Sequence, residues 1–160
     1  LKPLTLKLKK AGLKIVEGDN SIRIEKTERP ENLEVITLPY PGFPTDLQAP
    51  ITSMLTLAKG KSVIKETVFD SRFGHVAELN KMGADISVTN SRTVFVEGKN
   101  SLRGTEVEAT DIRAGAALVI AGLAGEGKTE ITGLKHLDRG YSKLLEHLQE
   151  IGANAERVDT

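Results

Sequence analysis

The sequence contains no cysteine and no tryptophan, and aromatic residues make up only 4% of it. Without cysteine the chain has neither a disulfide bond nor a thiolate metal ligand. Its 22 basic and 22 acidic residues cancel, so no net field attracts nucleic acid or an anionic membrane. The longest apolar run, roughly residues 114–124, contains glycines and is too short to cross a bilayer, and no signal peptide is recognisable. We therefore expect a cytoplasmic protein with no nucleic-acid or membrane partner.

The chain also lacks an initiator Met, and its first residues already follow a helix-like pattern. Such a beginning is typical of a part of a longer protein. At 160 residues the chain is nevertheless long enough to bury a hydrophobic core.

What the sequence does contain is an internal repeat. Three segments combine the end of an apolar helix, a glycine and a strand-like run, and their glycines, Gly12, Gly83 and Gly152, are 71 and 69 residues apart. TDLQAP at residues 45–50 and TDIRAG at residues 110–115 form a second pair at nearly the same spacing. Ordered landmarks at one period indicate duplicated structural units of about 70 residues.

The elements of each unit follow from local patterns. Thr-Asp predicts a helix start, with Thr as the cap and Asp in the first turn, and the apolar residues after it predict a helix buried on most sides. A Gly-Lys turn, a β-branched strand and an amphipathic helix ending at Gly83 or Gly152 follow. A hairpin with its turn at residues 90–92 completes the order helix, strand, helix, strand, strand.

Residues 122–129, GLAGEGKT, match the P-loop pattern of nucleotide-binding proteins. A P-loop lies between a preceding strand and a following helix, whose N-terminus binds the phosphates. Here the predicted order is reversed, and the sister segment LTLAKGKS has Leu55 in place of the first glycine. We interpret the match as a helix-ending turn.

A proline-rich segment precedes the first Thr-Asp pair. LPYPGFPTDLQAP places four prolines in the twelve residues after Leu38, which predicts a stiff loop. Such a loop can present the carboxylate of Asp46 at a helix start. The alternative is that Asp46 only caps the helix.

Arg72 and Arg139 occupy equivalent turns between a strand and a helix. The helix dipole opposes an arginine at a helix start and favours an anionic partner for it, so the pair suits an anionic substrate. The alternative is a structural salt bridge to Asp70 or Asp138. No metal site is expected, because the histidines show no ligand spacing and read as surface or packing residues: His75, His136 and His147.

Three motifs carry a resemblance to a known family. YPGFPTDLQA at residues 40–49, ATDIRA at 109–114 and HLDRGY at 136–141 closely resemble the UDP-N-acetylglucosamine enolpyruvyl transferases, or 1-carboxyvinyltransferases. The resemblance covers essentially all 160 residues. It implies an inside-out α/β barrel, with helices in the core and sheets outside, built from repeated β-α-β-α-β-β units.

The resemblance also implies a domain organisation. The chain corresponds to one incomplete domain, residues 1–160, from the C-terminal portion of a two-domain enzyme. Its repeat units are expected at approximately residues 1–40 (partial), 41–105 and 106–160.

The implied reaction transfers the enolpyruvyl group of phosphoenolpyruvate to the 3-hydroxyl of UDP-N-acetylglucosamine and releases phosphate. It opens peptidoglycan synthesis in bacteria and uses no cofactor. Addition and elimination pass through a tetrahedral ketal, so a base must take the hydroxyl proton and cations must hold the phosphate and carboxylate.

Residue roles carry over by motif. Asp46 is the expected base and contacts the sugar hydroxyl, and Arg139 reaches the phosphoenolpyruvate site as a second catalytic residue. Val68 and Phe69 lie against the sugar nucleotide, partly through backbone groups. Further substrate-binding residues near the interdomain cleft are Asp111, Arg113 and Arg72.

The family's reactive cysteine or aspartate, its catalytic lysine and its uridine-binding loop belong to the other domain, which is therefore an expected partner. Two alternatives stay open: the related transferase that acts on shikimate 3-phosphate, and a non-catalytic scaffold homologue. The incomplete third unit leaves an apolar flank uncovered, which favours self-association of the chain.

The first prediction concerns the isolated 160-residue chain. Because the other catalytic groups lie outside it, we expect no phosphate release above background from phosphoenolpyruvate and UDP-N-acetylglucosamine. A coupled phosphate assay tests this, and measurable turnover would contradict it.

Overall fold

The computed structural model describes residues 1–25 and 28–158, and its middle part forms one complete βαβαββ unit. The four strands of this unit form one sheet in the order β3-β4-β6-β5. β3 and β4 are parallel, and β6 is antiparallel to both of its neighbours. The elements of the unit are β3 (Glu34–Ile36), the 3-10 turn η1 (Thr45–Leu47), α2 (Gln48–Leu55), β4 (Lys61–Lys65), α3 (His75–Lys81), β5 (Asp85–Asn90) and β6 (Thr93–Glu97).

Parts of two further units flank the middle one. The preceding part is α1 (Lys2–Lys10) with the antiparallel hairpin β1 (Ile15–Glu17) and β2 (Ile22–Ile24). The following part has parallel strands and comprises β7 (Glu106–Glu108), α4 (Ile112–Ala124), β8 (Glu130–Thr132), α5 (Lys135–Asp138) and α6 (Leu144–Glu150). The short strand β3 opens the middle unit, and β7 opens the following one. The order of elements predicted from local sequence patterns contains neither strand.

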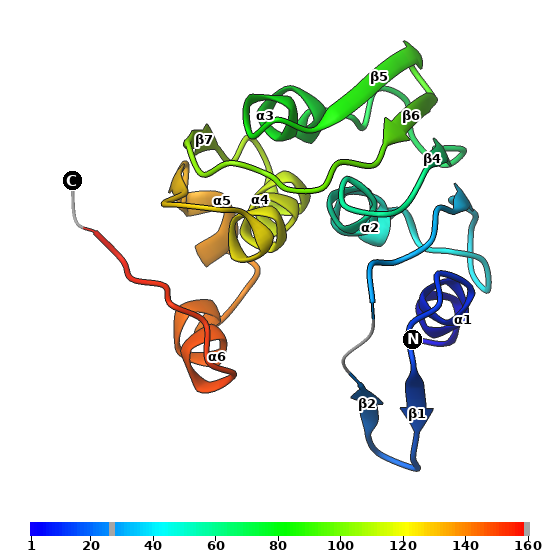
Figure 1. Ribbon diagram of the computed structural model, residues 1–160, viewed down its shortest axis with the longest axis horizontal. Helices are drawn as coiled ribbons and strands as arrows, with labels where there is room; N and C mark the ends of the chain where they lie inside the picture. Colours follow the sequence, from blue (N-terminus) through cyan, green and yellow to red (C-terminus); the bar gives the residue numbers. More distant parts are fainter. Residues whose placement is uncertain (26–27, 159–160) are drawn as a thin grey trace.

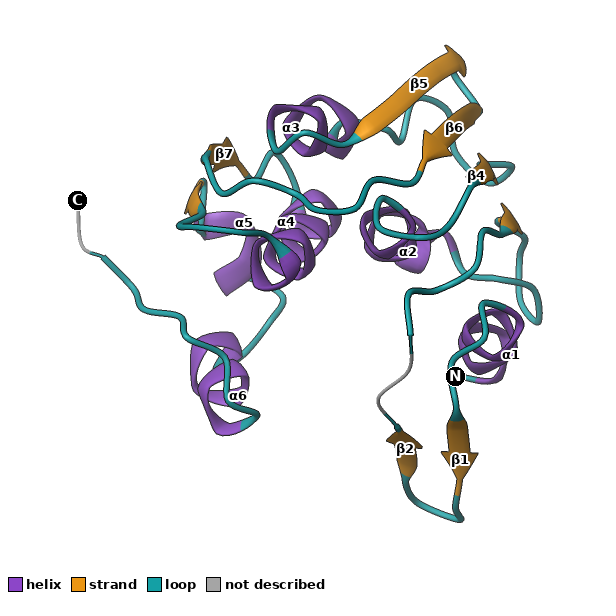
Figure 2. Ribbon diagram, in the orientation of Figure 1, coloured by secondary structure: helices purple, strands orange, loops and turns teal. Residues whose placement is uncertain are grey.

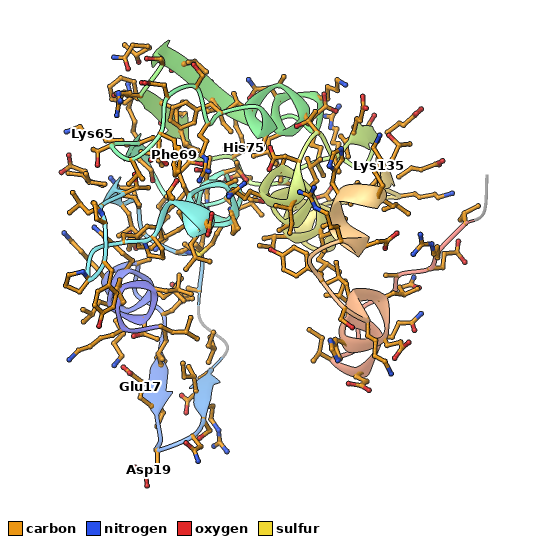
Figure 3. The ribbon with its side chains drawn as sticks, turned by 180° about the vertical axis from the view of Figure 1, so that it is seen from behind. Glu17, Asp19, Lys65, Phe69, His75 and Lys135 are labelled. Atoms are coloured by element: carbon orange, nitrogen blue, oxygen red, sulfur yellow. The ribbon has the colours of Figure 1, made fainter. Side chains whose placement is uncertain are left out.

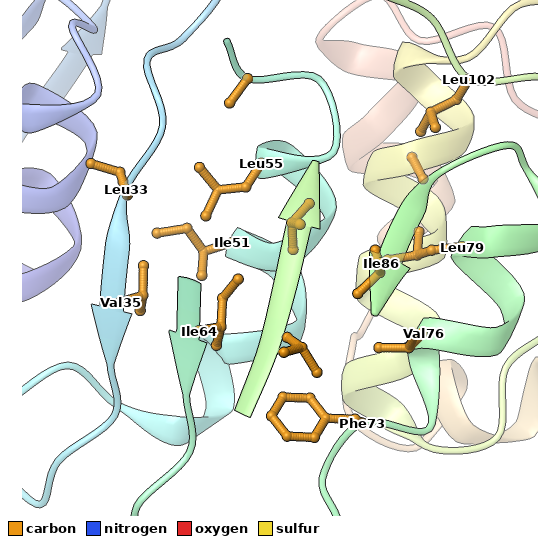
Figure 4. Packing of buried hydrophobic residues seen from close by; sticks show 14 of the residues in the cluster. Leu33, Val35, Ile51, Leu55, Ile64, Phe73, Val76, Leu79, Ile86 and Leu102 are labelled. Carbon is orange, nitrogen blue, oxygen red and sulfur yellow. The ribbon is translucent and has the colours of Figure 1, made fainter. Parts of the chain in front are cut away.

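Residues that alternate along β4 and β6 decide which face of the sheet is buried. Ile64, Val94 and Val96 are fully buried, whereas Lys61 and Lys65 point to solvent. The buried face packs on α2 and α3, and the close-up in Figure 4 shows Ile51 and Leu55 of α2 beside Ile64. One continuous hydrophobic cluster therefore joins sheet and helices.

The helices α2 and α4 lie inside and the sheets outside, as the resemblance implies. α2 and α4 pack side by side and are seen nearly end-on in Figure 2, while the strands occupy the outer rim. The ribbon in Figure 1 forms an open arch, with α6 at one end and the β1–β2 hairpin at the other. The described residues thus form part of the wall of an inside-out barrel, and they do not close the barrel.

The two apolar helices differ in burial. Most of α2 is buried, as predicted, because it contacts both the sheet and α4. In contrast, α4 is buried or half-buried at most positions but leaves one side open near its C-terminus, where Ile120 and Leu123 are 38% and 47% exposed. Ile151, after α6, is 80% exposed, and α6 buries none of its residues. An uncovered apolar flank is therefore present.

The P-loop-like segment is a helix-ending turn, as predicted. It begins in the last turn of α4 and ends just before β8, and Gly127 has the positive φ of +86° that such a turn requires. The sister turn at Gly60 has a φ of +70°. The hairpin turn is also confirmed, since the Asn90 side chain accepts a hydrogen bond from the Arg92 N–H at 2.9 Å. Among the described residues no helix is long and apolar enough to span a bilayer.

Arg29 connects the first part of the chain to the middle unit. Its guanidinium donates to the carbonyls of Leu57 and Ala58, at 2.7 and 2.8 Å, just beyond the end of α2. It also donates to the Lys99 carbonyl and the Asn100 side chain, at 2.6 and 2.7 Å. A cation is favourable at a helix C-terminus, where carbonyls are left without helical partners. This clamp holds three separate segments together.

His75 is a packing residue, as expected, and it is 2% exposed at the start of α3. Burial lowers the pKa of His75 from 6.5 to about 4, although the charge of Asp111 acts in the opposite direction. Its Nε2 atom has no hydrogen-bond partner in the part of the chain that the structure describes. The imidazole is therefore neutral in the folded protein near pH 7.

This lowered pKa predicts acid-sensitive stability. Between about pH 6.5 and about pH 4 the unfolded chain binds a proton at His75 and the folded chain does not, so the free energy of unfolding falls as the pH falls. The loss amounts to about 3 kcal/mol. Urea unfolding of His75→Gln should lack this component, whereas the exposed control His147→Gln should keep it. Equal pH dependence in both variants would contradict the prediction.

Candidate active site

Asp46 presents its carboxylate at the start of α2. It lies in the 3-10 turn η1 that follows Pro44, and its side chain is 70% exposed. Neither η1 nor α2 has a side-chain cap, so the alternative that Asp46 only caps a helix is wrong. Its Oδ1 atom instead accepts a hydrogen bond from Nε of Arg113 at 2.7 Å, and Nη1 of Arg72 lies 3.5 Å from the same oxygen.

Asp111, the equivalent residue in the next unit, does act as a cap. Its backbone is extended, and its Oδ1 atom accepts hydrogen bonds from the N–H groups of Arg113 and Ala114 at 2.7 and 3.2 Å. The cap is therefore Asp111 itself, one residue later than the predicted Thr110. By ordering the first turn of α4, Asp111 fixes the backbone from which Arg113 reaches Asp46.

Arg72 lies between Asp46 and Phe69. Its guanidinium carbon is 3.8 Å from the centre of the Phe69 ring, and Nη1 donates to Oγ1 of Thr45 at 2.9 Å. The alternative salt bridge to Asp70 is wrong, because Asp70 pairs with Nε of Arg92 at 2.7 Å. Phe69 projects from the loop after β4 and remains 47% exposed, so part of the ring is open to a ligand (Figure 3).

Glu66 is a functional candidate that the sequence reading missed. Its side chain is fully buried, and its carboxylate accepts hydrogen bonds from four donors. Oε1 accepts from the Thr37 hydroxyl at 2.7 Å and from the N–H groups of Val68 and Phe69 at 2.9 and 3.2 Å, and Oε2 accepts from the Thr45 hydroxyl at 2.8 Å. Burial acts to raise the pKa of Glu66, but these hydrogen bonds outweigh it and leave the pKa lowered. The alternation Ser62, Ile64, Glu66 on the buried face is the signal that could have found it.

The Glu66 hydrogen bonds restrict what the Val68–Phe69 segment can offer a ligand. Both backbone N–H groups are already used. A ligand at this segment therefore meets carbonyl oxygens, which accept from hydroxyl or amide donors, together with the two side chains.

Arg139 is not part of this cluster. It follows α5, is exposed, and forms no ion pair within residues 1–25 and 28–158. The alternative partner Asp138 instead binds Arg157, with Oδ2 at 2.8 Å from Nη2, and this hydrogen bond lowers the pKa of Asp138. The structure thus brings together Asp46, Arg72, Arg113 and Phe69, whereas no ion pair joins Arg139 to them within the described residues.

A profile of the EPSP synthase (3-phosphoshikimate 1-carboxyvinyltransferase) family matches residues 2–148. The chain belongs to this family. One of its relatives, the UDP-N-acetylglucosamine 1-carboxyvinyltransferase 1 of Caldanaerobacter subterraneus, is 50% identical to this chain over 151 residues. The UDP-N-acetylglucosamine 1-carboxyvinyltransferase of Trichormus variabilis is 52% identical over 157 residues. The alignments cover 94% and 98% of this chain but only 36% and 35% of the relatives, so the chain spans little more than a third of their length.

Solved structures of the family share the fold. The enolpyruvyl transferase NikO from Streptomyces tendae matches 96% of this chain and 36% of its own, with a TM-score of 0.88 and 30% identity. EPSP synthase from Acinetobacter baumannii matches 80% of this chain and 31% of its own, with a TM-score of 0.58 and 20% identity, which supports the fold alone. The enolpyruvyl transferase-like α/β fold predicted from the motifs is therefore confirmed for this family member.

The Asp46–Arg113 pair should contribute little to stability. The two side chains are 70% and 31% exposed, and such pairs typically contribute less than about 1 kcal/mol. Arg113→Gln should therefore change the free energy of unfolding in urea by less than about 1 kcal/mol. The more enclosed clamp residue provides the contrast, since Arg29→Gln removes several hydrogen bonds and should cost about 2 kcal/mol or more. A larger loss for Arg113→Gln than for Arg29→Gln would mark the Asp46 pair as structural.

Proposed function

We propose that the full-length protein transfers the enolpyruvyl group of phosphoenolpyruvate to the 3-hydroxyl of UDP-N-acetylglucosamine and releases phosphate. The observation that carries the proposal is the exposed carboxylate of Asp46, held by Arg113 and Arg72 inside the motif YPGFPTDLQA. The names of relatives at about 50% identity support the same reaction. Such an enzyme acts in the bacterial cytoplasm at the start of peptidoglycan synthesis.

Asp46 acts as the general base in this proposal. It takes the proton of the sugar hydroxyl while the hydroxyl oxygen adds to C2 of phosphoenolpyruvate and C3 gains a proton. Loss of phosphate from C2 and of a proton from C3 then restores the double bond in the product. Arg113 and Arg72 hold the carboxylate in one orientation, so it meets the hydroxyl without a search over rotamers.

The remaining site residues divide between the two substrates. The carbonyls and side chains of Val68 and Phe69 flank the sugar nucleotide, with the Phe69 ring held by Arg72. Asp111 acts indirectly, through the turn that carries Arg113. Arg139 binds phosphoenolpyruvate together with groups of the N-terminal domain, and it is exposed and forms no ion pair within the described residues.

The N-terminal domain is the proposed partner of the chain. It supplies the reactive cysteine or aspartate, the lysine and the uridine-binding loop. In its absence, the exposed apolar residues of α4 and the neighbourhood of α6 favour self-association, with Ile120, Leu123 and Ile151 as the exposed members.

Phosphate release by the full-length enzyme tests the reaction and the base together. We expect turnover with UDP-N-acetylglucosamine and none with shikimate 3-phosphate, the acceptor suggested by the family description. Asp46→Ala should lower kcat at least about a hundredfold, as for a lost general base, with an unchanged melting temperature.

Asp85→Ala is the matched control, because it removes a surface carboxylate that pairs with Lys99 outside the cluster. It should keep wild-type kcat. Turnover with shikimate 3-phosphate instead would reassign the acceptor, and full activity of Asp46→Ala would remove its role as base.

A further inference from the structure

We infer that Glu66 is a positioning residue that fixes the Asp46 turn and the Val68–Phe69 segment relative to each other. This inference rests on the function proposed above and names a residue that neither the motifs nor the relatives point to. Glu66 does not face the ligand side, since its side chain is fully buried. It acts through the residues it binds.

Three separate segments meet at the Glu66 carboxylate. Thr37 follows β3, Thr45 immediately precedes Asp46 in η1, and Val68 and Phe69 belong to the loop after β4. Thr37 also accepts a hydrogen bond from the N–H of Thr67 at 2.9 Å, so the same loop is held twice. No other carboxylate in the described residues joins the base-bearing turn to the proposed sugar-binding segment in this way.

The charge of Glu66 sets the direction of the hydrogen bonds. An ionised carboxylate only accepts, so the hydroxyl of Thr45 must donate to it. The Thr45 oxygen is then left to accept from Nη1 of Arg72, the guanidinium that also lies against Phe69 and Asp46. The chain Arg72 to Thr45 to Glu66 therefore orients both sides of the site from one buried negative charge.

The far end of the loop is also held, which confines the movable part to the site itself. The N–H of Ser71 donates to the Ser91 carbonyl at 3.1 Å, and Asp70 pairs with Arg92 in the same hairpin turn. Between Glu66 and these anchors lie Thr67, which is held by Thr37, and then only Val68 and Phe69. Loss of the Glu66 acceptor therefore releases the segment that is proposed to bind the sugar.

Packing alone gives no reason for a carboxylate here. Ile64, two residues earlier and facing the same side, is equally buried, and it shows that an apolar side chain packs well on this face. Burying a charge is costly unless donors surround it, and Glu66 has four. Three of these four donors belong to the Asp46 turn and the Val68–Phe69 segment, which points to positioning rather than to core stability.

Kinetics of the full-length enzyme with Glu66→Gln test the inference, with Glu97→Gln as the control. Glu97 is an exposed carboxylate at the end of β6 in the same sheet. In Glu66→Gln the amide donor faces Thr45 and breaks the fixed direction of the hydrogen bonds. We expect kcat/KM for UDP-N-acetylglucosamine to fall about ten- to a hundredfold, with KM for phosphoenolpyruvate within about twofold of wild type. Glu97→Gln should match wild type in both.

A double-mutant cycle separates positioning from loosened folding. If Glu66 acts through Asp46, Glu66→Gln should add little further loss of kcat in an Asp46→Ala background. Thr45→Val provides a second variant of nearly the same volume that cuts the same link while leaving the buried charge in place, and it should reproduce the selective loss for UDP-N-acetylglucosamine.

The outcomes distinguish this inference from the proposed function. A wild-type enzyme inactive with the sugar nucleotide would overturn the proposed function and with it the role of Glu66. Turnover by wild type with Glu66→Gln equal to Glu97→Gln would overturn the role of Glu66 alone. Equal losses for both substrates, additive with Asp46→Ala and accompanied by a lower melting temperature, would make Glu66 a structural residue only.

Discussion

The contact between α2 and α4 is the interaction on which the rest of the structure depends. These are the first helices of successive units, and they pack side by side inside the sheets. Small residues permit the close approach, and the buried hydroxyl of Ser53 donates to the Ala117 carbonyl across the contact at 2.7 Å. Because both helices begin on the same side, their first turns come together, and Arg113 of one reaches Asp46 at the start of the other. The candidate site is thus a product of packing between repeats.

Equivalent positions in the two repeats perform different tasks. Asp46 and Asp111 are 65 residues apart and both follow a threonine. In the first copy Pro44 leads into a 3-10 turn, and the Asp46 carboxylate is turned outward to two arginines. In the second copy Asp111 has an extended backbone, and its carboxylate caps the N-terminus of α4. The repeat builds the scaffold, whereas the departure from the repeat leaves one carboxylate exposed at the candidate site.

The sequence predicted what short-range patterns determine. Gly83, Gly127 and the turn at residues 90–92 lie where the patterns put them, since a positive φ or a tight hairpin restricts the residue type locally. The motifs identified the family and the fold. Strands β3 and β7 escaped notice because three residues carry no clear alternation. Arg29 escaped because its partners are mostly backbone carbonyls far along the chain, which leave no trace in any side-chain pattern.

The sequence predicted which residues belong to the candidate site, but it did not predict which of them contact each other. Asp46, Arg72 and Arg113 follow from motifs, yet nothing local indicates that both arginines converge on one carboxylate or that Asp70 and Asp138 pair elsewhere. Glu66 looks like an ordinary charged residue until the position directly after β4 is known to face inward. Pairing across repeats is a tertiary property, and here it decides which charges remain for a substrate.

Charge balance within the cluster is consistent with the proposal that this part of the protein acts together with a second domain. Arg72 and Arg113 are offset by Asp46 and by the buried carboxylate of Glu66, which leaves no surplus of positive charge near Asp46. Phosphoenolpyruvate carries a phosphate and a carboxylate, and stabilising both requires several cations aimed at them. Arg139 is exposed and unpaired within the described residues, yet it lies outside the Asp46 cluster. In the proposed reaction this part of the protein holds and deprotonates the acceptor sugar, whereas the charges that bind and activate phosphoenolpyruvate come from Arg139 and from the N-terminal domain. This assignment of the two substrates follows from the pairing of Arg72 and Arg113 with Asp46, which leaves neither arginine free for phosphoenolpyruvate.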